Sequence, residues 1–133
     1  QCLVGSVDVI KTSDSGYAVV TESGDSRLSE SAADSLLALV RQPIGEIYLN
    51  SIDQDGTGQG YDLSILTLLP KICPIPIILA GGIGNAKHLA VGFLDDRVDA
   101  VATANLFNFV GDGLIESRKD ILLNSDLIAS WEI

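Results

Sequence analysis

The alternation of short apolar runs with helix-like segments constrains the fold of this chain most strongly. Each run is rich in β-branched residues and has the length of one strand, and the runs are residues 2–9, 46–52, 75–80 and 98–104. Apolar residues recur at helical spacing between them, in residues 31–41, 63–69 and 88–94. Nearly continuous apolar strands separated by amphipathic helices indicate a parallel sheet covered by helices, because every parallel connection must cross over the sheet.

One segment departs from this alternation. Residues 16–22 (GYAVVTE) form a further strand-like run between two clusters rich in serine, aspartate and glycine. Such clusters are typical of turns. We therefore expect a small hairpin or extended excursion before the first helix.

The number of strand and helix units favours half of a (β/α)8 barrel. A Ser-apolar-Asp triplet occurs at Ser6–Asp8 and again at Ser51–Asp53, near the predicted carboxyl ends of two successive strands. Repeated βα units that end in polar residues are typical of this barrel, whose active site lies on that face. A complete barrel needs at least about 200 residues, and this chain has 133. We predict a single α/β domain over residues 1–133, the (βα)4 half of a TIM barrel with parallel strands and flanking helices.

An open half-barrel would leave one face of its sheet and two strand edges uncovered. Unpaired backbone groups along such edges need partners. Either the missing half of the barrel or a second copy of the chain in a two-fold dimer would supply them. The chain begins at Gln1 and contains no methionine, which reads as a piece of something longer. We expect a homodimer or higher homo-oligomer where the other half is absent.

Composition narrows the classes of partner. The net charge of −10 comes without any basic cluster, so we expect no nucleic acid partner. No apolar run reaches the roughly 20 residues of a membrane span, so we expect no membrane association. Cys2 and Cys73 lie in apolar stretches without metal-ligand spacing, which favours reduced thiols, a cytoplasmic location and no metal site. We also expect no cofactor.

Two aspartates are candidates for acid/base chemistry. Asp8 lies at the predicted end of the first strand, and Asp55 opens a glycine-rich loop that contains Thr57. A carboxylate at the mouth of a barrel can act as a general acid or base, whereas the alternative for Asp8 is an aspartate that caps a turn. The loop superficially resembles a calcium-binding loop, but Thr57 and Ser64 occupy its fifth and twelfth positions, which argues against calcium. A purely structural turn remains the alternative for the loop.

A second glycine-rich loop, LAGGIGN over residues 79–85, follows the third predicted strand. Glycines at Gly81 and Gly82 would let the backbone approach an anion at the start of a helix. The spacing does not fit the GxGxxG dinucleotide fingerprint. We interpret this loop as a phosphate cradle, with Ala104 and Asn105 on the next strand as its other wall, although a Gly-Gly pair is also common in simple tight turns.

Four segments, in this order and spacing, resemble the second half of HisF, the cyclase subunit of imidazole glycerol phosphate synthase. They are SVDV, EIYLNSIDQDGTGQGYDLSIL, IPIILAGGIGNAKH and VDAVATANLFNF. The resemblance covers nearly all of the chain to about Phe109. It implies a barrel that receives ammonia from a glutaminase subunit and adds it to a phosphorylated ribonucleotide, which yields imidazole glycerol phosphate in histidine biosynthesis.

The resemblance also implies roles for individual residues. Asp8 matches the second catalytic aspartate of the family, and Asp55 matches its active-site loop and is taken as catalytic with it. The residues taken as substrate-binding are Ser51, Thr57, Gly81, Gly82, Ala104 and Asn105. Asn105 stands where the family commonly has serine, so a side-chain contact to phosphate is changed there.

The same resemblance leaves alternatives open. The first catalytic aspartate and the other phosphate site of the family belong to the N-terminal half, so this chain alone lacks half of the acid/base pair. A sister group of HisF-like proteins, which works with an amidotransferase on bacterial surface sugars, carries very similar loops. A non-catalytic half-barrel that only binds phosphate is the further alternative to an enzyme.

Overall fold

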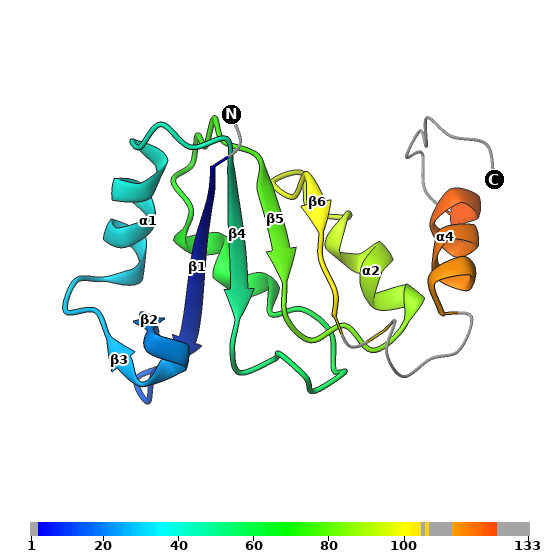
Figure 1. The fold of residues 1–133 in the computed structure, drawn as a ribbon, viewed down its shortest axis with the longest axis horizontal. Coiled ribbons are helices and arrows are strands. Elements are labelled where there is room, and N and C mark those ends of the chain that lie inside the picture. The colour runs from blue at the N-terminus through cyan, green and yellow to red at the C-terminus, as the bar shows by residue number, and fades with distance from the viewer. Residues whose placement is uncertain (1–2, 105, 107–112, 125–133) are drawn as a thin grey trace.

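The computed structural model of the chain describes residues 3–104, 106 and 113–124 (Figure 1). Within these residues, six strands form one sheet in the order β3-β2-β1-β4-β5-β6. The strands are β1 (Val4–Lys11), β2 (Tyr17–Thr21), β3 (Ser26–Arg27), β4 (Glu46–Ser51), β5 (Ile77–Ala80) and β6 (Ala100–Val101). The main strands β1, β4, β5 and β6 pair in parallel. The predicted mostly parallel sheet with flanking helices is therefore confirmed.

The segment GYAVVTE forms a hairpin with the first strand, as predicted. β2 runs antiparallel to β1 and pairs with Asp8–Lys11, while β3 adds a short antiparallel pairing beyond a 3₁₀ helix, η1 (Glu22–Gly24). This pairing carries β1 past Asp8 to Lys11, so the expectation that the first strand ends at Asp8 is wrong. A strand continues as long as a neighbour satisfies its backbone groups, and β2 does so here.

The last two main strands are shorter than predicted. β5 begins at Ile77, and β6 is limited to Ala100–Val101. The ladder between them ends where the backbone amides of Asp99 and Ala102 donate to the carbonyl oxygens of Ile77 and Leu79. β6 is short because, in the described part of the chain, its one pairing partner is the four-residue β5.

The predicted helical segments are present, with one change of type. α1 (Ala32–Val40) is capped at its N-terminus by Ser31, whose hydroxyl oxygen accepts the amide of Asp34. α2 (Ala86–Gly92) is capped by Asn85, whose side chain accepts the amide of His88. These are ordinary N-caps. The segment after β4 is a 3₁₀ helix, η2 (Leu63–Leu68), rather than an α-helix. Pro70 follows η2 closely, and a proline at that point prevents the helix from continuing.

The main core lies on one face of the sheet. Alternate residues of the strands are buried there, including Val9 of β1, Leu49 of β4 and Leu79 of β5, each fully buried. They pack against Leu36 of α1 and Leu66 of η2. Figure 1 shows these helices flanking the sheet. Alternation is expected because successive side chains of a strand point to opposite faces.

The other face of the sheet is largely uncovered. Val4 and Ser6 of β1 are exposed, and Tyr48, Asn50 and Ile78 of the next strands are only half-buried. This is the face that would line the interior of a closed barrel. The uncovered face expected of an open half-barrel is thus present.

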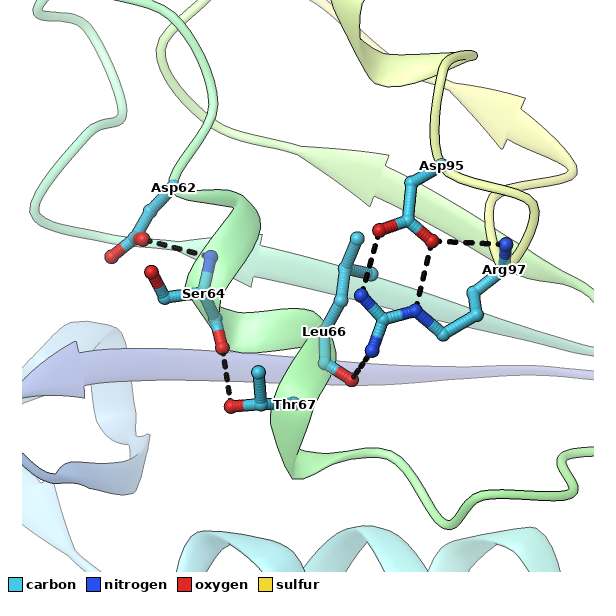
Figure 2. Close-up of polar contacts among 6 residues, drawn as sticks. All are labelled: Asp62, Ser64, Leu66, Thr67, Asp95 and Arg97. Carbon is cyan, nitrogen blue, oxygen red and sulfur yellow. Dashed lines mark hydrogen bonds and ion pairs between the residues drawn. The ribbon is translucent and has the colours of Figure 1, made fainter.

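Arg97 fixes the end of the sheet opposite the glycine-rich loops (Figure 2). Its guanidinium donates to both carboxylate oxygens of Asp95 and to the carbonyl oxygen of Leu66 in η2, at 2.6 to 2.8 Å. The hydrogen bond from Arg97 is the main reason that the pKa of Asp95 falls to about 2. The loop that precedes β6 is thereby tied to the helix that covers β4.

A second, smaller cluster lies around α2. It joins Ile83, Leu89 and Leu106, and α4 (Gly113–Asn124) packs against α2 beside it. The sequence patterns had not singled out α4. Within the described residues, no helix combines the length and the apolar character needed to cross a membrane.

Candidate functional site

The loops that follow the main strands gather at one edge of the sheet. Because those strands are parallel, their carboxyl ends meet there, and Figure 1 shows the loops after β4 and β5 at the same end of the sheet as the β1–β2 hairpin. A pocket of about 70 Å³ opens at this edge. It is lined by Tyr48, Asp55, Gly56, Gly81, Gly82, Ile83, Ala102, Thr103 and Ala104. The structure thus brings together four of the predicted site residues, namely Asp55, Gly81, Gly82 and Ala104.

Asp8 lies on the uncovered face of the sheet beside this pocket. Its side chain is half-buried and accepts a hydrogen bond from the side-chain amide of Asn50 at 3.0 Å. Asn50 is the cross-strand neighbour of Asp8 in the parallel ladder. Its amide oxygen also lies within 2.9 Å of where a Cβ on Gly81 would be. Asn50 therefore connects the carboxylate to the glycine-rich loop.

The two Ser-apolar-Asp triplets do not occupy equivalent positions in the sheet, although the repeat had suggested that they would. Asp8 pairs with Asn50, whereas Asp53 lies beyond the end of β4. The carboxylate of Asp53 accepts the backbone amide of Lys11 instead. A repeat in the sequence does not fix register, because register depends on where pairing begins.

Tyr48 is close enough to both candidate carboxylates for their charges to act on its phenol. It belongs to the same face of β4 as Asn50 and lines the pocket. Burial is the main cause that raises the pKa of its phenol, and the negative charges of Asp55 and Asp8 raise it further. The phenol therefore stays protonated at neutral pH and can donate a hydrogen bond to an anion in the pocket. Alternation along EIYLNS was the signal that could have identified both Tyr48 and Asn50.

The loop that carries Asp55 is ordered by its own backbone. The amides of Gln54 and Asp55 donate to the carbonyl oxygen of Ser51. The hydroxyl of Thr57 donates to the carbonyl oxygen of Gln54 at 2.7 Å and accepts the amide of Gln59 at 3.2 Å. The Thr57 side chain is thus engaged within the loop and does not line the pocket.

Gly81 and Gly82 form the wall of the pocket with backbone alone. Their φ angles are +94° and +99°, in a region that L side chains rarely adopt. A Cβ on Gly82 would lie 2.1 Å from the carbonyl oxygen of Gly60, and one on Gly81 would lie 2.6 Å from that of Ser51. The amide of Gly60 in turn donates to the carbonyl oxygen of Gly82 at 2.7 Å. The two glycine-rich loops interlock so closely that no side chain fits between them.

The remaining predicted residues have different positions. Ser51 is buried on the helix-covered face with Leu49, and its hydroxyl has no hydrogen-bond partner among the described residues. Its side chain is not among those that line the pocket. The buried hydroxyl oxygen of Thr103, also without a partner in the described part of the chain, does belong to a pocket residue. Asn105 lies outside the described residues.

In the described part of the chain, His88 and the acidic residues are not grouped as a metal centre. Nδ1 of His88 accepts the backbone amide of Gly84 at 3.2 Å, and its ring also contacts Asn85. Among the residues that the structure describes, no group of three His, Cys, Asp or Glu side chains is placed to hold a metal ion. The groups that the described residues present at this edge are carboxylates, a phenol, the hydroxyl of Thr103 and backbone amides.

Comparison with known proteins places the chain in a family. The sequence model of the family described as "Histidine biosynthesis protein" matches residues 1–111. A protein of Parasynechococcus marenigrum (strain WH8102), described as "Putative imidazole glycerol phosphate synthase subunit hisF2", is 38% identical over 134 residues. That alignment includes 100% of this chain and 49% of the relative, so the chain spans about half the length of the curated relative that it matches. The chain therefore belongs to the histidine biosynthesis protein family and is HisF-like in sequence.

Proposed function

We propose that the chain is the C-terminal, Asp8-bearing half of an ammonia-dependent cyclase of the HisF type, which forms imidazole glycerol phosphate. One observation carries this proposal: Asp8, Asp55 and the Gly81–Gly82 backbone meet at the carboxyl edge of one parallel sheet, on or beside its uncovered face. Family membership supplies the reaction class. The substrates are a phosphorylated ribonucleotide and ammonia that a glutaminase subunit releases.

In this proposal, Asp8 acts as a general acid or base. The hydrogen bond from Asn50 holds one of its carboxylate oxygens and leaves the other available for a proton. Asp55 acts from the lining of the pocket. A positioned acid/base group typically accounts for a rate factor of about 10² to 10⁴.

The pocket suits the phosphate end of the substrate. One water molecule needs roughly 10 to 15 Å³ of cavity volume. A pocket of about 70 Å³ therefore has room for a phosphoryl group and not for a whole nucleotide. The Gly81–Gly82 backbone and Thr103 lie in its lining. We assign phosphate to this pocket, whose lining includes Ala104, and the rest of the ribonucleotide to the uncovered face that carries Asp8, with Thr57 in the adjoining loop.

The half-barrel needs a complement. Its uncovered face and the unpaired edge of β1 before Asp8 require either the remaining half of a barrel or a second copy of the chain. In the two-fold dimer that we propose for the isolated chain, the second Asp8 stands in for the missing carboxylate. Light scattering should then give twice the chain mass of 14.0 kDa, and a monomer at assay concentration would exclude the dimer.

We also place the protein in the reducing cytoplasm. Cys73 is a free, half-buried thiol whose Sγ–H donates to the carbonyl oxygen of Ile75. A thiol engaged in this way in an apolar segment fits a compartment where disulfides are rare.

A steady-state assay with the ribonucleotide and ammonium tests the function. Asp8→Asn should lower turnover by about 100-fold or more, while binding of inorganic phosphate persists. Asp96→Asn is the matched control, because Asp96 is an exposed aspartate away from the pocket. Phosphate binding without turnover in the wild-type protein would refute the cyclase and favour a phosphate-binding half-barrel.

A further inference from the structure

Lys11 contacts both ends of the loop that carries Asp55. Its backbone amide donates to Oδ2 of Asp53 at 2.6 Å, at the start of the loop. Its ammonium Nζ lies 2.9 Å from Oδ2 of Asp62, at the end of the loop. Residues 53–62 are therefore held at both ends by one residue of the β1–β2 hairpin.

Asp62, the partner of the Lys11 ammonium, is nearly buried and has several hydrogen-bond donors. Its side chain is only 6% exposed. Besides Lys11, it accepts the hydroxyl of Tyr17 on β2 at 2.7 Å and the backbone amide of Ser64 at 3.1 Å, the second of which Figure 2 shows. Burial alone would raise the pKa of Asp62, but the hydrogen bonds from Lys11, Tyr17 and Ser64 together lower it. A nearly buried carboxylate is stable only with such donors.

The geometry keeps Lys11 away from the pocket. Side chains alternate along β1, so Lys11 belongs to the face of Val7 and Val9, which is packed against the helices. Asp8 belongs to the opposite face. Lys11 also does not line the pocket. Any effect of Lys11 on the site must therefore pass through the loop.

The loop needs such an anchor. Gly56, Gly58 and Gly60 have positive φ angles, and glycine-rich segments lose more conformational entropy on ordering than others. Tyr61, near the end of the loop, is its one side chain that packs against the apolar clusters of the described residues. The contacts of Asp53 and Asp62 with Lys11 add a polar tether at each end.

We propose that Lys11, together with Tyr17, is a positioning residue that clamps residues 53–62 and so fixes Asp55 against the Gly81–Gly82 wall. The role of Asp55 in this statement rests on the proposed function, whereas the clamp itself does not. In this proposal the β1–β2 hairpin has a functional role, because it holds the loop that carries Asp55.

Hydrogen–deuterium exchange, read by mass spectrometry on the whole chain, tests the clamp without any substrate. Lys11→Met should raise the exchange rate of residues 53–62 by about threefold or more, and leave α1 unchanged. Lys11→Arg should restore the wild-type rate, because it keeps a cationic donor. Lys71→Met, at an exposed lysine in the loop before β5, is the matched control and should change nothing in residues 53–62.

Tyr17→Phe keeps the test decisive if Lys11→Met unfolds the protein. It removes one hydroxyl and should raise exchange in residues 53–62 alone. If Lys11→Met folds and leaves the exchange of residues 53–62 unchanged, the clamp is overturned. If Lys11→Met does not fold, unchanged exchange of residues 53–62 in Tyr17→Phe overturns it.

Activity provides the second readout. In the cyclase assay, Lys11→Met should lower kcat more than it raises KM, and Lys11→Arg should restore kcat. If the wild-type protein has no turnover, the proposed function fails while the exchange result still decides the clamp. If Lys11→Met loosens the loop and kcat is unchanged, the clamp exists but does not position a catalytic group, which overturns the positioning role.

Discussion

The close contact between the two glycine-rich loops predicts that Gly82→Ala destabilises the protein. At φ +99°, an alanine is strained by about 1 to 3 kcal/mol. Its Cβ would also lie 2.1 Å from the carbonyl oxygen of Gly60. This neighbour is backbone, so one loop must move, and overpacking of this kind costs about 1 to 3 kcal/mol more. We expect Gly82→Ala to lower the free energy of unfolding by about 2 to 6 kcal/mol.

Gly58→Ala is the matched control in the facing loop. Gly58 also has a positive φ, +68°, but a Cβ there would meet only the Cα of Gly84, at an ordinary 3.6 Å. The substitution therefore carries the left-handed strain of about 1 to 2 kcal/mol and no clash. Part of that strain is offset because alanine restricts the unfolded chain.

Urea unfolding followed by far-UV circular dichroism measures both variants. The free energy of unfolding should fall by at least about 1 kcal/mol more for Gly82→Ala than for Gly58→Ala, with similar m-values. Equal losses for the two variants would refute the interlocked arrangement, since they would show that the space beside Gly82 is open.

Three further predictions concern the core, the Arg97 contact and the Lys11–Asp62 pair. Leu49→Ala should lower the free energy of unfolding by about 2 to 5 kcal/mol in the same urea assay, because Leu49 is fully buried; a loss under about 1 kcal/mol would contradict its core position. Arg97→Gln should raise the pKa of Asp95 from about 2 toward the ordinary value of about 3.9 in an NMR titration, and no rise would show that the hydrogen bond is absent. Since the fold lowers the pKa of Asp62, this group stabilises the protein above about pH 4, and its contribution is lost as the pH falls below that value. Lys11→Met should therefore make the decline of stability below about pH 4 shallower in thermal melts, and an unchanged slope would refute the coupling.

Local pattern was enough to predict most of the main strands and helices, but not α4 or the 3₁₀ form of η2. Apolar runs and helical spacing are properties of adjacent residues, so the parallel strands, α1, α2 and the hairpin from residues 16–22 were all predicted. The strand ends were not. β1 continues to Lys11 because β2 pairs with it, and that pairing is not visible in residues 2–9.

The sequence anticipated the positions of some candidate site residues and missed the positions of others. Asp55, Gly81 and Gly82 line one pocket as the glycine-rich loops suggested. Ser51 and Asn50 show the limit, because the face on which a strand residue lies depends on register, and a shift of one residue reverses it. The structure directs Asn50 toward Asp8 and buries Ser51 with the core.

The sequence alone therefore determined the family, the order of strands and helices and the chemical types of the candidate groups. Only the tertiary structure decided which groups meet. The Asn50–Asp8 hydrogen bond, the contact of Lys11 with both ends of the Asp55 loop, and the fit of Gly82 against Gly60 all join residues more than 20 positions apart. Such contacts depend on how the sheet pairs and twists as a whole, and no short stretch of sequence encodes that geometry.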